Sequence, residues 1–172
     1  IESNAESVLQ EVGVRFSENQ SALNLWKNAG ADIKGDIVRI PKGLAKSLCS
    51  TIPSKFFQKA RNPERSVEIG GNSMVLAPVY GPPFIRTVEE GRRYATMSDF
   101  NKLVKLGYSS KWLHHSGGTV CEPTDVPVNK RHLDMLFAHM TLSDKPFMGS
   151  VTEPERAEDS VEMCKLLFGK DF

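Results

Sequence analysis

The 172 residues of this chain suffice for a buried core, and 40% hydrophobic with 25% charged residues is ordinary for a globular protein. The 22 basic and 21 acidic residues balance to a net charge of +1, which argues against a nucleic-acid-binding surface, and the apolar runs are too short for a membrane span. Three cysteines without CxxC spacing predict neither a disulfide framework nor a metal site, and they favour a cytoplasmic protein.

The N-terminal segment predicts two short amphipathic helices. Residues 3–12 carry apolar side chains at helical spacing, and Ser3 with Glu6 matches a capping box. The "SENQ" sequence at 17–20 predicts the start of a second helix, which we expect to end at Gly30. The chain begins with Ile rather than Met, so we expect it to be a piece of a longer protein.

Short β-prone runs follow the two helices. Two strands are expected around Gly35, and a helix is expected after Pro41. Further strands are predicted at "KFFQKA", "SVEIGG", "MVLAPVY" and "PFIRT", with "RNPER", "GGN", "GPP" and "EEGRR" as turns between and after them. We therefore divide the chain into residues 1–70, with helices and a small β segment, and residues 71–172, in which we expect helices and strands to alternate.

Helices and strands alternate in the second region. A helix is expected to begin at Thr96 and Asp99 and to stop at Gly107, followed by a strand at "WLHHSGGTV", a helix, a strand at "KPFMGSV" and a last helix. The apolar faces of the last two helices are predicted to consist of Leu133, Leu136, Phe137 and Met140, and of Val161, Cys164, Leu167 and Phe168.

A short motif occurs twice at the ends of these two expected strands. "GGTVCEP" and "MGSVTEP" both contain Gly, a small hydroxyl residue, Val, any residue, Glu and Pro, and Gly118 and Gly149 lie 31 residues apart. This interval matches one βαβ unit, whose strands are parallel and whose crossover is right-handed. Ligands bind at the carboxyl ends of parallel strands, so the motif predicts the location of a site.

The candidate site residues are the polar and aromatic side chains at these strand ends. We expect a substrate to be lined by Tyr80, Phe84, Thr119, Glu122, Asp125, Ser150 and Glu153. The carboxylates have an alternative role as helix-capping groups, and Thr152 with Glu155 matches a capping box.

Four aromatic residues flank the same strand ends. Tyr80, Phe84, Tyr94 and Trp112 match either ordinary packing or an aromatic cage for a quaternary ammonium group, and the sequence leaves both interpretations open. Three further residues, His114, His115 and Cys121, are weaker candidates for a functional role. Their spacing matches no zinc site, and Cys121 has no recognisable base as a partner for nucleophilic catalysis.

Several motifs together resemble the trimethylamine methyltransferase family. They are "EVGVRF", "AGAD", "APVYGPPF", "GGTVCEPTDVPV" and "LSDKPFMGSVTEPERAEDSVEM", and they are spread over nearly the whole chain. The resemblance implies a (β/α)8 TIM barrel, of which this chain supplies the N-terminal helices and strands and the first βα units. It also implies methyl transfer from a methylated amine, such as trimethylamine or glycine betaine, to the Co(I) corrinoid of a separate corrinoid protein, without assigning catalytic residues.

Two other hypotheses remain open beside this one. The chain alone could act as a non-catalytic half barrel that binds a partner or a second copy, since a partial barrel leaves a sheet edge unpaired and is expected to lack activity by itself. An unrelated barrel lyase or oxidoreductase would require a phosphate loop or a Schiff-base lysine, for which "IGGNS" and Lys145 are the weak candidates.

Overall fold

The structure is a computed structural model that describes residues 1–170. The chain forms two compact units, Ile1–Ser54 and Lys55–Phe172. The sequence-based division, by contrast, places residues 55–70 with the first region. The pairing of the strands at 55–58 and 67–70 keeps this segment together. The division into domains at residue 70 stays a prediction.

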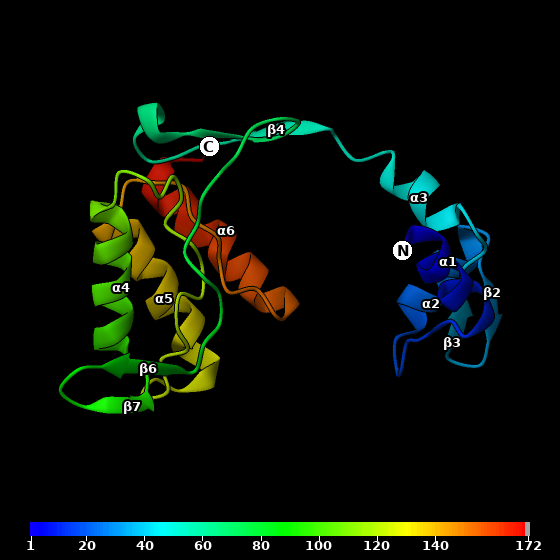
Figure 1. Cartoon of the computed structure of the whole chain (residues 1–172), viewed down its shortest axis with the longest axis horizontal. Coiled ribbons are helices and arrows are strands. Elements are labelled where there is room, and N and C mark those ends of the chain that lie inside the picture. The colour runs from blue at the N-terminus through cyan, green and yellow to red at the C-terminus, as the bar shows by residue number, and fades with distance from the viewer. Residues whose placement is uncertain (171–172) are drawn as a thin grey trace. The chain divides into compact units, whose positions relative to one another are not determined.

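The first unit packs three short helices on a three-stranded antiparallel sheet with strand order β1-β3-β2 (Figure 1). Its elements are α1 (Glu2–Glu11), β1 (Val14–Arg15), α2 (Gln20–Asn28), β2 (Asp32–Lys34), β3 (Ile37–Arg39) and α3 (Leu44–Cys49). Val38 of β3 is fully buried, and it lies in a cluster with Ala31 and Ile40. Gly35 has a φ of 63°, which allows the tight turn between β2 and β3.

The helix starts in this unit differ from the predicted capping boxes. Ser3 lies inside α1 rather than before it, and Glu6 accepts a hydrogen bond from the Gly43 backbone N–H at 3.0 Å. The cap of α2 is Asn19, whose side chain accepts from the Ala22 N–H at 2.9 Å. The short polar Asn side chain reaches this donor from the position directly before the helix, so the predicted start at Ser17 is two residues too early.

The second unit combines two antiparallel hairpins with three longer helices. Its elements are β4 (Lys55–Gln58), the 3-10 turn η1 (Pro63–Arg65), β5 (Val67–Gly70), β6 (Phe84–Thr87), β7 (Gly91–Tyr94), α4 (Met97–Ser109), α5 (Val128–Leu142) and α6 (Pro154–Phe168). The predicted helix start at Thr96 and Asp99 is confirmed, and these two residues form a capping box. Gly107 does not end α4, which continues to Ser109, and Gly91 begins a strand that the sequence assigned to a turn.

Three predicted strands of this unit are extended segments without a regular ladder. "MVLAPVY", "WLHHSGGTV" and "KPFMGSV" contain no assigned strand. Pro78 and Pro146 lack the N–H that a ladder requires, and Gly117 has a φ of 90°, outside the β region. The prediction of regular strands was wrong at these places because proline and glycine interrupt the pairing.

The same segments nevertheless run side by side in the parallel direction. The His114 and Glu122 N–H groups donate to the carbonyls of Leu76 and Pro82, and the Gly81 N–H donates to that of Thr119. On the other side of this middle segment, the Ser116 N–H donates to the Pro146 carbonyl at 2.8 Å, and the Met148 N–H donates to the Gly117 carbonyl at 2.9 Å. Partners on both sides advance together along the chain, as in parallel strands.

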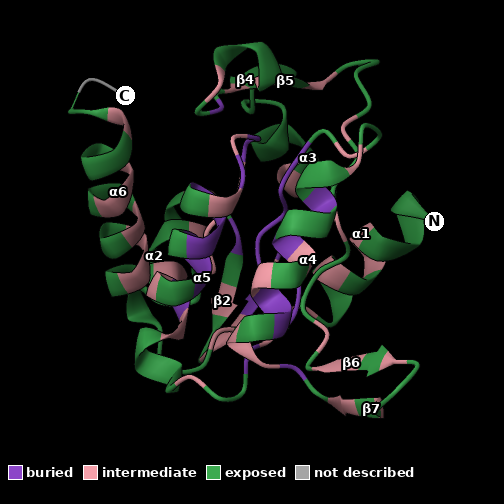
Figure 2. Cartoon of the chain, turned by 90° about the vertical axis from the view of Figure 1, so that its left-hand side faces the viewer, coloured by how far each residue is buried: buried purple, intermediate pink, exposed green. Residues whose placement is uncertain are grey.

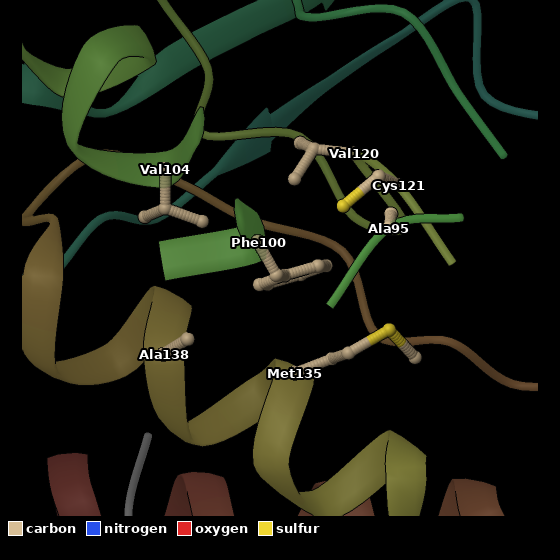
Figure 3. Close-up of a cluster of buried hydrophobic side chains, with 7 residues drawn as sticks. All are labelled: Ala95, Phe100, Val104, Val120, Cys121, Met135 and Ala138. Atoms are coloured by element: carbon tan, nitrogen blue, oxygen red, sulfur yellow. The ribbon is translucent and has the colours of Figure 1, made fainter. Parts of the chain in front are cut away.

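The core of the second unit lies between α4, α5 and the middle extended segment (Figures 2 and 3). Phe100 and Val104 of α4 are fully buried, and they belong to one cluster with Met135 and Ala138 of α5. Full burial of a side chain such as Phe100 contributes about 2–3 kcal/mol relative to leaving it in water. This cluster fixes α4 and α5 beneath the predicted strand ends.

The predicted apolar face of α5 is only partly right. Leu136 and Met140 are buried, whereas Phe137 is 59% exposed. The buried face instead includes His132 and His139, because both histidines find hydrogen-bond partners. The predicted face of α6 differs as well: no residue of α6 is fully buried, and Val161 and Leu167 are exposed, whereas Cys164 and Phe168 are half-buried.

The fold is therefore a mixed α/β arrangement. Two helices, α4 and α5, connect successive extended segments that lie next to each other, which is the connectivity of βα units. The assigned sheets are all antiparallel and small. The complete TIM barrel stays a prediction.

Candidate functional site

Tyr80, Gly118 and Thr119 come together where the first two extended segments end. The Gly81 N–H donates to the Thr119 carbonyl at 2.7 Å. The Tyr80 hydroxyl lies directly against Gly118, so that a Cβ at this glycine would lie 2.6 Å from the Tyr80 Cζ and 3.1 Å from the Met148 carbonyl oxygen. The groups that approach the first motif glycine closely are therefore a candidate site residue, Tyr80, and the next segment.

The second motif glycine faces a helix instead. A Cβ at Gly149 would lie 3.1 Å from the Ser160 Oγ of α6. Ser150 is half-buried at the start of this connection. Glu153 occupies the position before α6 and is 61% exposed, with its Oε2 3.7 Å from the Arg156 Nε. The predicted capping box at residues 152 and 155 does not form, because Glu153 rather than Thr152 precedes the helix.

The two other carboxylates hold helices in place. The Arg131 guanidinium of α5 donates to Glu122 Oε1 at 2.8 Å and also donates to the Val126 carbonyl at 3.0 Å. Asp125 accepts from the Met97 N–H at 2.8 Å, so it caps α4 rather than the helix that follows it. The Asp125 contact supports the capping interpretation, whereas Glu122 pairs with the side chain of Arg131 and does not cap α5; its own side chain is about one-third exposed.

The four aromatic residues do not meet in one cage. Phe84 and Tyr94 are in ring contact, with centroids 4.6 Å apart, and the Arg92 guanidinium lies 3.8 Å from the Phe84 ring centre. Trp112 is exposed next to Lys111, whereas Tyr80 lies on Gly118. Within the described residues, Phe84 with Tyr94 is the one contact between rings of this set.

A buried histidine network supports the turn at the first motif, and sequence reasoning missed it. The Ser116 hydroxyl donates to His139 Nδ1 at 2.7 Å, and His139 Nε2 donates to the Gly118 carbonyl at 2.7 Å. Burial, helped by the nearby His115, lowers the pKa of His139 to about 4. His139 therefore stays neutral near pH 7 and holds the backbone of the glycine on which Tyr80 rests.

His115 supports the same turn from the other side. The Gly117 N–H donates to His115 Nδ1 at 2.8 Å, so Nε2 carries the proton and donates to Gln58 Oε1 at 3.2 Å. Burial lowers the pKa of His115. Residues 132, 135, 136 and 139 have helical spacing and are buried in α5, and this spacing was the sequence signal for the two buried histidines. The predicted apolar face was shifted from it by one residue.

The weaker candidates have structural roles. Burial raises the pKa of the Cys121 thiol to about 11, which keeps this group protonated and unreactive. Lys145 Nζ donates to the carbonyls of Gly107 and Ser110 at 2.9 and 2.8 Å, and thus satisfies the carboxyl end of α4. In the part of the chain that the structure describes, no three His, Cys, Asp or Glu side chains gather as metal ligands.

No helix among the described residues is both long and apolar enough to cross a membrane.

Comparison with known proteins agrees with the motifs over the whole chain. The trimethylamine methyltransferase (MTTB) family model matches residues 1–172. A glycine betaine methyltransferase from Desulfitobacterium hafniense (strain Y51) is 42% identical over 98% of this chain and 35% of its own length. A proline betaine:corrinoid methyltransferase from Eubacterium limosum is 27% identical over 84% of this chain and 30% of its own length.

The chain thus spans about a third of the length of these relatives. The match of the family model over all 172 residues and the 42% identity to a methyltransferase lead to one assignment. The chain belongs to the trimethylamine methyltransferase family.

Proposed function

We propose that the protein containing this chain transfers a methyl group from a methylated amine to the Co(I) corrinoid of a separate corrinoid protein. The observation that carries the proposal is the 42% identity to a glycine betaine methyltransferase over nearly the entire chain. The two relatives are named for glycine betaine and proline betaine, which are quaternary ammonium compounds. Their similarity therefore supports a quaternary ammonium substrate rather than trimethylamine for the protein that contains this chain.

The reaction breaks one N–CH3 bond. The methyl carbon is bonded to cobalt, and the amine leaves with the electron pair of the broken bond. The corrinoid on its carrier supplies the nucleophile, so the polypeptide has to bind the cation, orient the methyl group and exclude water.

Tyr80 and Thr119, which lie next to each other, are the central residues of the proposed substrate site. Burial raises the pKa of Tyr80, so its hydroxyl stays protonated at neutral pH. Its neutral ring then offers an electron-rich face to a methylated cation, an interaction of about 0.5–2 kcal/mol. Thr119 is buried beside it with its backbone fixed by Gly81.

The remaining candidates line the approach to this position in our proposal. Glu122 and Glu153 keep part of their carboxylates exposed, so they attract a cation while they also pair with arginines. Asp125 positions α4, and Phe84 and Ser150 complete the proposed set of substrate-binding residues. We also propose that the two consecutive βα connections belong to a TIM barrel in a cytoplasmic protein.

The half-barrel hypothesis is supported by a different observation. Leu166 of α6 is 88% exposed, and Val161 and Leu167 on the same helix are exposed as well. Apolar side chains in this arrangement are expected to be covered in an assembly or by the rest of a longer chain. If this chain acts alone, its role would be assembly or binding rather than methyl transfer.

The test uses the full-length protein and purified candidate corrinoid proteins reduced to Co(I). Glycine betaine, proline betaine and trimethylamine are added separately, and formation of methyl-Co(III) is followed by its absorbance. We expect methylation with at least one quaternary amine, and we expect Tyr80→Ala to raise the KM for that amine about tenfold. If none of these donors methylates cobalt, the proposed function is wrong.

A further inference from the structure

The hairpin of β6 and β7 has one face that points away from the core. Cross-strand partners share a face, and the register pairs Phe84 with Tyr94 and Arg86 with Arg92. Ile85 lies on the opposite face and packs against the core cluster, which fixes the orientation of the hairpin. We call Phe84, Arg86, Arg92 and Tyr94 the outer hairpin face.

Two arginines of like charge lie directly opposite each other on this face. Arg86 and Arg92 are both exposed, and no carboxylate among the described residues forms an ion pair with either one. Two nearby carboxylates are already paired, because Arg93 on the other face binds Glu90 at 2.7 Å and Asp99 at 2.6 Å. Glu89 lies in the connecting turn. Like charges directly opposite each other destabilise a strand pair unless an anion compensates them.

The Phe84 ring positions the Arg92 guanidinium for contact with a ligand. The Arg92 guanidinium lies over the Phe84 ring, 3.8 Å from its centre, and the Phe84 and Tyr94 rings are in tilted contact with centroids 4.6 Å apart. A guanidinium that lies over a ring keeps its N–H groups at the edge, where a carboxylate binds them. Tyr94 is 60% exposed, and aromatic residues together with arginine are typical of protein interfaces.

The hairpin also stands next to the proposed substrate position. It begins two residues after Pro82, whose carbonyl accepts the Glu122 N–H at 3.0 Å. Figure 1 shows β6 and β7 at the end of α4 where this helix begins. A protein that docks on the outer hairpin face is therefore close to the strand ends.

We propose that the outer hairpin face binds an acidic surface of a partner protein, with Arg86 and Arg92 pairing with its carboxylates and Phe84 and Tyr94 packing against it. The identification of this partner as the corrinoid protein rests on the proposed function. Charge complementarity selects a carboxylate-bearing partner, because the two arginines leave an uncompensated positive charge on an exposed face.

The test compares two double variants of the full-length protein that remove the same charge. Arg86→Gln/Arg92→Gln alters the outer hairpin face, and Lys102→Gln/Lys105→Gln alters exposed lysines of α4. A fluorescein-labelled octaglutamate peptide serves as the anionic probe in a low-salt anisotropy titration. A second measurement follows the rate of methyl transfer at different concentrations of the corrinoid protein, with the methylated amine at a saturating concentration.

We expect the arginine variant to raise the peptide Kd and the KM for the corrinoid protein about tenfold, with no more than about a twofold change in the lysine variant. The KM for the methylamine should stay the same. Equal effects of both variants, or no effect, would overturn the proposed surface. Loss of thermal stability in the arginine variant without a change in peptide binding would also overturn it, since the face would then be covered by the protein's own chain.

The two measurements separate this inference from the proposed function. If no donor methylates cobalt, the proposed function fails, and the peptide titration still decides whether the face binds carboxylates. If methyl transfer occurs but only peptide binding depends on the arginines, the corrinoid protein is not the partner of this face.

Discussion

Replacement of His139 by Gln should remove a pH dependence from the stability of the second unit. In the native chain the imidazole is buried and neutral, since Nδ1 accepts from Ser116 and Nε2 donates to the Gly118 carbonyl. Protonation of Nδ1 eliminates the acceptor and places a charge in the core. Gln carries a donor and an acceptor but has no charge at any pH of interest.

The size of this loss of stability follows from the pKa of His139, which is about 4 in the folded chain and 6.5 for an ordinary histidine. Because the folded state binds the proton less readily, stability is full above pH 6.5 and is lost as the pH falls toward 4. Linkage gives a loss of about 2 kcal/mol between pH 8 and pH 5, and about 3 kcal/mol by pH 4.

Urea unfolding at pH 8, 7, 6 and 5 measures this effect as the difference between the native chain and His139→Gln. The difference removes the contributions of His115 and of the carboxylates, which titrate in both proteins. The variant should be less stable at pH 8, because its side chain no longer contacts the Phe100 ring, which lies 5.4 Å away edge-on. Parallel pH profiles for the two proteins would refute the buried, neutral state of His139.

Further substitutions test the structural roles assigned above, each by urea unfolding at pH 7. Gly118→Ala should destabilise the chain by about 1–3 kcal/mol, since the new Cβ overlaps Tyr80, and Gly107→Ala serves as a control, because its Cβ would meet the nearest atom, Pro78 Cγ, at an ordinary 3.5 Å. Asp99→Asn should destabilise the chain by about 1–3 kcal/mol, because Arg93 holds the pKa of Asp99 well below its usual range and the substitution removes the charge from this partly buried pair; an unchanged stability would contradict that role. Lys145→Met should cost about 2 kcal/mol by leaving two helix carbonyls unpaired, and an unchanged stability would show that water replaces the ammonium group.

Helix positions were predictable from the sequence because local signals determine them. Thr96 and Asp99 form the capping box of α4, and Gly30 and Gly35 adopt the left-handed conformations that a helix end and a tight turn require. The parallel arrangement of the segments around the repeated motif also followed from its spacing, although Pro78 and Pro146 prevent the regular strands that β propensity indicated.

The contacts within the candidate site were not predictable in the same way. The packing of Tyr80 on Gly118 joins residues 38 positions apart, and the capping of α4 by Asp125 joins residues 28 positions apart. Such pairings depend on how the segments lie in space. The buried role of His139 was hidden for another reason, because histidine is assigned to the polar face of a helix unless its hydrogen-bond partners are known.

The proposed methyl transfer is tested most directly by a single-turnover reaction with methyl-13C-labelled glycine betaine. The full-length protein is mixed with the donor and a corrinoid protein reduced to Co(I), and the label is followed by NMR. We expect one labelled methyl group on cobalt for each dimethylglycine formed. Label that stays on glycine betaine in the presence of every candidate corrinoid protein, with proline betaine and trimethylamine also unreactive, would contradict the proposed activity.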